Sequence, residues 1–225
     1  MNTNDDLIAN LSRDLAPVSP APNINLLATV WILLSAVFVV AVTHLYAPIR
    51  PGAFSQLTTE PRFLLESLLG LAAIFWTGLI AFRAAIPGAL NRKFAAIGLI
   101  LMALWLAQYV IGLFNSPLDP STLGKRDHCF IETMVYSLPP IIIGLFLIHR
   151  LYPLRFVQSA MSISLAAAML PALYMQLACM YEPSHILAFH IFPGLVMVLA
   201  GAAIATLWRA HQQGVGGKTM KTSTR

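Results

Sequence analysis

The sequence predicts an all-α integral membrane protein, a bundle of six transmembrane helices with both ends of the chain in the cytoplasm. Of its 225 residues, 58% are hydrophobic and only 10% are charged, whereas about a quarter of the residues of a soluble domain are charged. The apolar residues form six runs, each long enough to cross a bilayer core of about 30 Å, which takes about 20 helical residues. The charged residues lie mostly between these runs, as expected of links at the membrane surface.

Short links with proline and glycine separate the six apolar runs, which cover residues 26–47, 63–82, 94–114, 129–148, 156–178 and 185–208. The runs are apolar on all sides and about twice the length of the alternating strands of a membrane barrel, so helices are predicted. The first run is too long, and the tail before it too acidic, for a cleavable signal peptide. We expect a cytoplasmic N-terminal segment at 1–25, a transmembrane domain at 26–208 and a disordered cytoplasmic tail at 209–225.

The lysines and arginines predict the orientation of the bundle. With the N-terminus inside, ten of the 14 lie on the inner side, and the outer side has Arg50, Arg62, Lys125 and Arg126. Positive residues accumulate on the cytoplasmic side of membrane proteins, so a multi-pass protein of a bacterial inner membrane with both termini inside is expected. The positive charges are dispersed singly, which gives no support for direct binding of nucleic acid.

Two cysteines are expected at the outer face of the membrane. Cys129 begins the fourth apolar run and Cys179 follows the fifth, 50 residues later. Neither belongs to a CxxC motif, which argues against a zinc ribbon or a thioredoxin-type motif. Three alternatives stay open for the pair: a structural disulfide, a redox- or metal-responsive pair, or two inert apolar thiols.

Imidazole and carboxylate side chains are expected at the same depth as the cysteines. The candidate metal ligands are His128, Glu132, Glu182, His185 and His190. On a helix, Glu132 shares a face with His128 and with Cys129, and thiolate and imidazole ligands suit zinc, cadmium or copper(I). We expect no resident cofactor but a transient heavy-metal ion at the outer face; the alternative for each histidine is a filler of the membrane interface.

The N-terminal segment is predicted to form a short amphipathic helix. Its apolar residues repeat at helical spacing, beside an acidic polar side, and the residues that define the helix are Leu7, Ile8, Leu11, Asp14 and Leu15. Three prolines between positions 17 and 22 end the helix and extend the link to the membrane. The helix either lies on the membrane surface or fills a groove on a soluble partner. Its acidic face is the wrong sign for anionic lipid, which favours a basic partner such as a nucleic-acid-binding protein.

Several motifs occur together along the chain. They are Asp6-Leu-Ile…Leu11…Asp14-Leu-Ala-Pro-Val18, Glu60-Pro-Arg-Phe-Leu-Leu-Glu66, Ala85-Ile-Pro-Gly88, Cys129 with Ser137-Leu-Pro-Pro140, and Cys179 with Glu182-Pro-Ser-His185 and His190. In these the chain resembles the NrsF-like membrane anti-sigma factors, the negative regulators of sigma F. It departs from that pattern at Phe189, where the family usually has tryptophan, and at Ala178, where it often has histidine.

The resemblance implies a regulator that acts by binding. Its N-terminal segment, through the five helix residues above, would hold an extracytoplasmic-function sigma factor at the membrane. A heavy-metal or oxidative signal sensed by Cys129 and Cys179 would release it. Membrane lipid is the other expected partner, and neither catalytic residues nor enzymatic activity are expected. The runner-up is a small-molecule or metal-ion transporter, for which Tyr109, Tyr174 and Gln176 are among the few intramembrane polar residues; a membrane oxidoreductase is a third class.

Overall fold

The computed structural model describes residues 3–13 and 22–222, and every regular element within them is helical. The elements are α1 (Thr3–Arg13), α2 (Ile24–Tyr46), α3 (Ala53–Thr59), α4 (Pro61–Ala84), α5 (Arg92–Gly112), α6 (Cys129–His149), α7 (Phe156–Ala178), α8 (Pro183–Ile186), η1 (Leu187–Ile191) and α9 (Phe192–Thr222). Six segments are long and apolar enough to cross a membrane: α2, α4, α5, α6, α7 and Pro183–His211. The last of these joins α8, η1 and most of α9. The predicted bundle of six transmembrane helices is confirmed.

The beginnings of two transmembrane helices follow from local capping chemistry. Asn23 precedes α2, and its side-chain oxygen accepts a hydrogen bond from the amide of Leu26 at 3.2 Å. Asn91 precedes α5 and accepts from the amide of Phe94 at 2.7 Å. Each asparagine satisfies one of the backbone donors that a helix start leaves without a partner. Both residues stand just before an apolar run, so composition and capping agree on where the helix begins.

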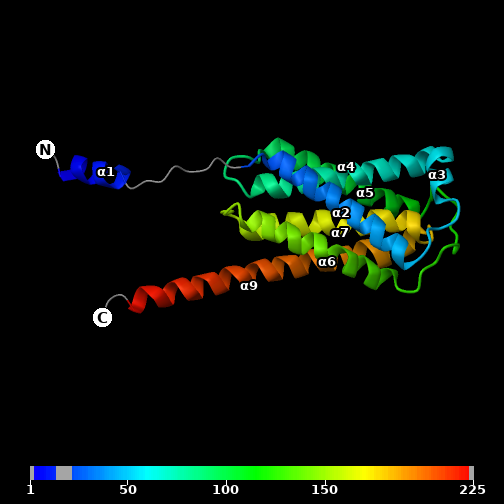
Figure 1. The fold of residues 1–225 in the computed structure, drawn as a ribbon. Helices are drawn as coiled ribbons and strands as arrows, with labels where there is room; N and C mark the ends of the chain where they lie inside the picture. The colour runs from blue at the N-terminus through cyan, green and yellow to red at the C-terminus, as the bar shows by residue number, and fades with distance from the viewer. Residues whose placement is uncertain (1–2, 14–21, 223–225) are drawn as a thin grey trace.

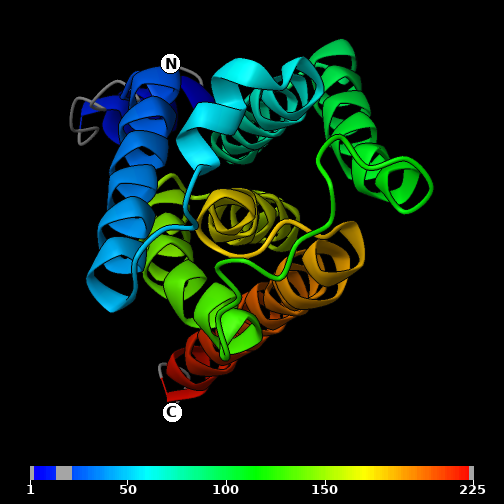
Figure 2. The same ribbon diagram turned by 90° about the vertical axis from the view of Figure 1, so that its right-hand side faces the viewer.

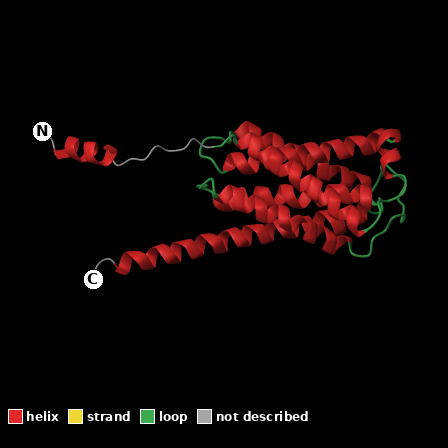
Figure 3. Ribbon diagram, viewed as in Figure 1, coloured by secondary structure: helices red, strands yellow, loops and turns green. Residues whose placement is uncertain are grey.

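Consecutive membrane-spanning helices run in opposite directions, so the beginning of α2 and the end of α9 lie at the same end of the bundle (Figure 1). We call this the terminal end. The opposite end carries α3 and the connections 113–128 and 179–182, drawn as loops in Figure 3. Because Cys129 begins α6 and Cys179 ends α7 there, we call it the cysteine end. An even number of spans places the two termini on one side of the membrane.

Helix α7 lies at the centre of the bundle, with the other membrane-spanning helices around it (Figure 2). It contacts α2, α4, α6 and α9, and 72% of its apolar window is buried, against 22% for α5. Small side chains permit this close packing, as is usual between helices in membranes. The fully buried alanines of α7 are Ala160, Ala166, Ala167, Ala168, Ala172 and Ala178. A movement of α7 would therefore change the packing of most helices in the bundle.

Two close contacts fix the helices beside α7. A Cβ atom at Gly201 of α9 would overlap the hydroxyl of Ser164 on α7, so the two backbones approach at a position that only glycine fits. The indole nitrogen of Trp31 on α2 donates to the carbonyl of Pro140 on α6 at 3.1 Å. This bond joins two helices that are far apart in the sequence.

The structure differs from the sequence prediction in three places. The short helix α3 lies in a stretch expected to be a link. The last span begins at Pro183 and contains a π-helical turn, η1. Helix α9 continues to Thr222, whereas disorder was expected for 209–225. No proline follows Pro193, so no proline interrupts the helix that emerges from the membrane.

Candidate functional site, a buried cluster of two cysteines and two histidines

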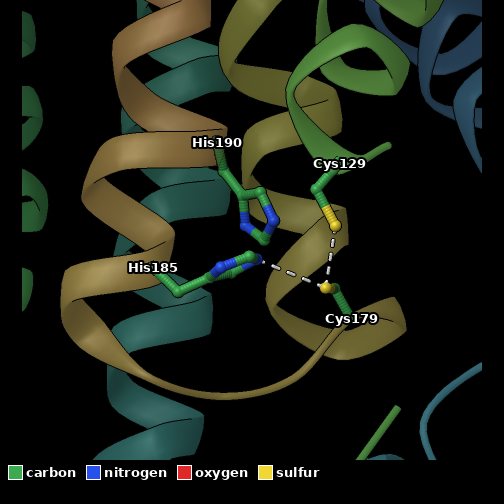
Figure 4. A group of neighbouring side chains, drawn as sticks. All are labelled: Cys129, Cys179, His185 and His190. Atoms are coloured by element: carbon green, nitrogen blue, oxygen red, sulfur yellow. Dashed lines mark hydrogen bonds between the residues drawn. The ribbon is translucent and has the colours of Figure 1, made fainter. Parts of the chain in front are cut away.

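Cys129 and Cys179 meet at the cysteine end of the bundle (Figure 4). Cys129 is the first residue of α6, and Cys179 follows the last residue of α7. Their sulfur atoms are 2.9 Å apart, and both residues are free thiols that are 2% and 0% exposed. The packing of α6 against α7 thus brings together two residues that are 50 positions apart in the sequence.

Two histidines of the last span approach the cysteine pair from the side (Figure 4). Nε2 of His185 lies 3.5 Å from the sulfur of Cys179. The ring of His190 is 5.1 Å from that of His185, measured between centroids, and the two planes are nearly perpendicular. The four side chains are buried, and one ligand atom from each lies within 4.8 Å of all the others. We call Cys129, Cys179, His185 and His190 the Cys–His cluster.

The π-helical turn explains how both histidines reach the cysteines. In an α-helix, residues five apart point about 140° away from each other. At η1 the amide of Phe192 bonds to the carbonyl of Leu187, five residues earlier. This wider turn brings His190 back towards the face of His185. Single π turns of this kind occur frequently at functional sites.

Hydrogen bonds within the cluster act on the thiols. The Cys129 sulfur lies 3.4 Å from the backbone carbonyl oxygen of Arg126 and 2.9 Å from the Cys179 sulfur. The hydrogen bond from Cys129 lowers the pKa of the Cys179 thiol, and the neighbouring imidazoles of His185 and His190 act in the same direction against the effect of burial. Cys179 is therefore the more readily ionised sulfur, which is the form that binds metals and reacts with oxidants.

A cleft leads from the surface of the cysteine end to the Cys–His cluster. It has a volume of about 730 Å³, and its lining includes Asp127, His128, Cys129, Glu182 and His185. Apolar side chains such as Phe130, Ile131 and Met180 line the rest of it. The cluster is thus buried but lies next to a cleft that carries both polar and apolar groups.

The three other predicted metal ligands lie outside the cluster. Glu132 is buried and forms an ion pair with Arg126 at 2.9 Å. Glu182 caps α8, where its carboxylate accepts hydrogen bonds from the amides of Ser184 and His185. His128 is exposed in front of α6. The structure therefore joins His185 and His190 to the cysteines and gives the two carboxylates other partners.

Arg126 was predicted only as a positive charge of the outer face, and its role depends on tertiary contacts. Besides its bond to Glu132, its guanidinium donates to the carbonyls of Thr43, Ala47 and Pro48 at 3.2, 2.6 and 3.2 Å. It therefore caps the end of α2 and joins it to the first turn of α6. One signal for this pairing is visible in the sequence: an acidic residue inside an apolar run, six positions after an arginine.

A second group of polar residues lies among the helices beside the cluster. The hydroxyl of Tyr181 donates to Glu66 at 2.9 Å. Burial raises the pKa of Tyr181, so this phenol keeps its proton and remains a donor. The side chain of Gln176 accepts from Tyr109 and donates to Ser67. The bonds of Gln176 join α4, α5 and α7, and sequence reasoning connected neither set of residues.

The apolar residues of the N-terminal helix are open to a partner. Leu7, Ile8 and Leu11 of α1 are 58%, 63% and 62% exposed. The two further residues predicted for this surface, Asp14 and Leu15, lie outside the described residues. We call Leu7, Ile8 and Leu11 the leucine face of α1.

The family model described as "NrsF: Negative regulator of sigma F" matches residues 11–209. The chain belongs to this family. No curated protein and no solved structure matches the chain. The matched residues include the first five spans completely and the sixth except for its last two residues. They also include the whole Cys–His cluster.

As a member of the negative regulator of sigma F family, the chain is an anti-sigma factor with a transmembrane domain, and its partner is a sigma factor. The match begins at Leu11, so it includes one residue of the leucine face and leaves Leu7 and Ile8 before it. The resemblance found in the sequence motifs is confirmed.

Proposed function

We propose that this chain holds an extracytoplasmic-function sigma factor at a bacterial inner membrane and releases it when a heavy-metal or oxidative signal reaches Cys129 and Cys179. The observation that carries the proposal is the contact between the two thiols at the end of the bundle opposite the termini. A regulator with a reactive pair on one side of the membrane and a binding segment on the other can transmit a signal across it.

The charges of the bundle support a cytoplasmic position for the terminal end. The helix ends and links there carry Arg83, Arg92, Lys93, Arg150 and Arg155, in accordance with the accumulation of positive residues inside. At the cysteine end, by contrast, Arg50 and Arg126 are only 4% and 8% exposed. This distribution supports a cytoplasmic terminal end, which would place the thiols on the oxidising side of the membrane, where disulfides form.

The leucine face of α1 supports binding of a soluble protein. An amphipathic helix commonly binds by placing its apolar residues, spaced three or four apart, in a groove on the partner. The first turn of α1 carries Asp5 and Asp6, which would complement a basic surface. Proteins that bind nucleic acid are usually basic, so a sigma factor has the appropriate charge.

The packing of the bundle supports a mechanical link between the two ends. The cysteines and histidines come from the outer ends of α6, α7 and the last span, and α7 contacts α2, which follows the N-terminal segment. Metal binding, or a disulfide formed as an oxidant removes two electrons and two protons from the thiols, would change how these helices pack. Shifting a sigma factor from 99% bound to 99% free takes about 5.5 kcal/mol, which a metal–thiolate site can supply.

The transporter alternative has less support from the described polar residues. Tyr109, expected to line a path, donates to Gln176, and Gln176 donates to Ser67. A cavity of about 270 Å³ beside them is lined mainly by leucine, alanine and valine. Polar groups that satisfy one another within an apolar wall do not form a hydrophilic path for a solute.

The proposal is tested by capture of a sigma factor from membranes that contain the tagged full-length chain. We expect the intact chain to co-purify a sigma factor and a chain lacking residues 1–22 to capture at least tenfold less. The triple variant Leu7→Ala, Ile8→Ala, Leu11→Ala should show the same loss. Asn10→Ala, which removes an exposed polar side chain of the same helix, should capture normally. Equal capture with and without the segment would contradict the proposal.

A further inference from the structure

We infer that the Cys–His cluster is a tetrahedral site for a d10 divalent cation, zinc or cadmium, in which His185 and His190 are ligands beside the two thiolates. Two sulfur and two imidazole nitrogen donors form one of the common ligand sets of zinc in proteins. The proposed function needs only the cysteines. The histidines make the site specific for a metal, and its role as receptor of the signal rests on that function.

The positions of the ligand atoms are close to what a tetrahedral ion requires. With bonds of about 2.3 Å to sulfur and 2.0–2.1 Å to nitrogen, neighbouring ligand atoms stand about 3.3–3.8 Å apart. The distance of 3.5 Å from His185 Nε2 to the Cys179 sulfur already lies in this range. The two sulfurs, 2.9 Å apart, would separate by about 0.9 Å to hold the ion. The other ligand atoms lie within 4.8 Å of one another, so they would approach by up to about 1 Å to surround the ion.

The buried ring of His190 points to a ligand at this site independently of the ligand distances. Its side chain is 0% exposed, yet neither ring nitrogen has a hydrogen-bond partner among the described residues. An imidazole buried in this way loses its bonds to water without compensation, which is unfavourable. Its ring is directed towards the sulfur atoms (Figure 4). A cation bound to one ring nitrogen would provide the missing partner.

The surroundings of the cluster favour a soft cation over a hard one. Magnesium and calcium require several oxygen ligands, and the two nearest predicted carboxylates, Glu132 and Glu182, are held by Arg126 and by the start of α8. The cleft that includes Cys129 and His185 in its lining, together with Asp127, Glu182 and Ser184, gives the ion a route. On binding, each thiol gives up its proton to water, so that two protons leave as one divalent cation enters.

Metal binding would join three separate segments of the bundle. Cys129 belongs to the beginning of α6, Cys179 to the end of α7, and the two histidines to the beginning of the last span. An ion held by all three segments would fix their relative positions at the cysteine end. The structural change that the sigma factor senses would then be a change in how α6 and the last span pack on α7.

The test is a titration of the purified, reduced full-length protein in lipid nanodiscs with Co²⁺, followed by Zn²⁺. We expect saturation at one ion per chain, with the visible absorption of tetrahedral cobalt, sulfur-to-metal charge transfer, and displacement by zinc. His185→Asn and His190→Asn should each lower the affinity at least tenfold. His128→Asn removes an exposed histidine of the same cleft and should leave it unchanged. Absence of saturable binding, an equal loss in the His128 variant, or no loss in the other two would overturn the inference.

A second measurement needs no variant and so does not depend on whether His190→Asn folds. X-ray absorption at the zinc edge of the loaded wild-type protein should show two sulfur and two nitrogen neighbours. Two sulfurs with only water-like oxygen neighbours, or fewer sulfurs, would exclude the four-ligand site. Neither measurement includes a sigma factor, so the two proposals can fail separately. A failure to capture a sigma factor would contradict the proposed function and leave the metal site standing. Absence of metal binding would contradict the metal site and leave the capture of the sigma factor unaffected.

Discussion

Arg126 and Glu132 form a buried ion pair beside the two cysteines. Arg126 Nη1 lies 2.9 Å from Glu132 Oε2, and the two side chains are only 6% and 5% exposed. The backbone carbonyl of Arg126 contacts the Cys129 sulfur at 3.4 Å, and its guanidinium also donates to carbonyls at the end of α2. One residue therefore connects the cysteine pair, the first turn of α6 and the helix that follows the N-terminal segment.

Removal of this arginine should strongly destabilise the bundle. Arg126→Met leaves the Glu132 carboxylate buried without its cation, which typically costs about 3–5 kcal/mol. Thermal unfolding of the purified protein in detergent should show a clear decrease in midpoint. Lys125→Met, an exposed neighbour, should unfold at nearly the wild-type temperature. Equal midpoints for the two variants would show that the buried pair contributes little.

The cysteines should form an intramolecular disulfide under mild oxidation. Their sulfurs are 2.9 Å apart, and closing a loop of 50 residues stabilises a chain by about 2–4 kcal/mol. Treatment with a two-electron oxidant such as diamide should reduce the intact mass by two hydrogens and raise the unfolding midpoint. Cys129→Ser should show neither change. Covalent dimers in place of the internal bond would contradict the observed pairing.

The contact of α7 with α9 should tolerate no side chain at Gly201. A Cβ atom there would overlap the Ser164 hydroxyl, and overpacking of a tight helix contact costs about 1–3 kcal/mol. Gly201→Val should therefore lower the unfolding midpoint. Ala203→Val, two residues along on the exposed face of α9, serves as the matched control. If both variants behave like wild type, the two helices are not in close contact.

Both termini should lie in the cytoplasm and the cysteine end outside. Green fluorescent protein fused to either end should fluoresce, whereas alkaline phosphatase should be active only when inserted in the loop of the cysteine end, for example after Leu123. The distribution of lysine and arginine predicts this orientation. Phosphatase activity at a terminus would reverse the direction of the proposed signal.

The membrane-spanning helices could be predicted closely from the sequence because length and apolarity alone decide them. The fifth run, expected at 156–178, is α7 (Phe156–Ala178) in the structure. The helical continuation after residue 208 was missed, since its lysines, glycines and threonines are typical of a disordered tail. Disorder was inferred there from composition. Composition does not take into account that a helix already formed in the membrane can continue beyond it.

The candidate site was predicted only in part, because its geometry depends on packing. Cys129 and Cys179 were placed at one membrane face by the count of spans, but their contact requires α6 to lie against α7. His185 and His190 were expected near the cysteines together with Glu132 and Glu182. The sequence does not reveal that a π turn brings both histidines to one side, nor that Arg126 and the start of α8 hold the two carboxylates.

The most direct test of the coupling between the two ends is the capture of the co-purifying sigma factor by the full-length chain in nanodiscs. Capture is measured in the reduced, metal-free state and again after oxidation or loading with cadmium. The amount of sigma factor captured by the wild-type chain should fall at least tenfold on either treatment. The amount captured by the double variant Cys129→Ser, Cys179→Ser should not change. Unchanged capture by a wild-type chain whose cysteines are demonstrably oxidised or metal-bound would contradict the proposed transmission of the signal.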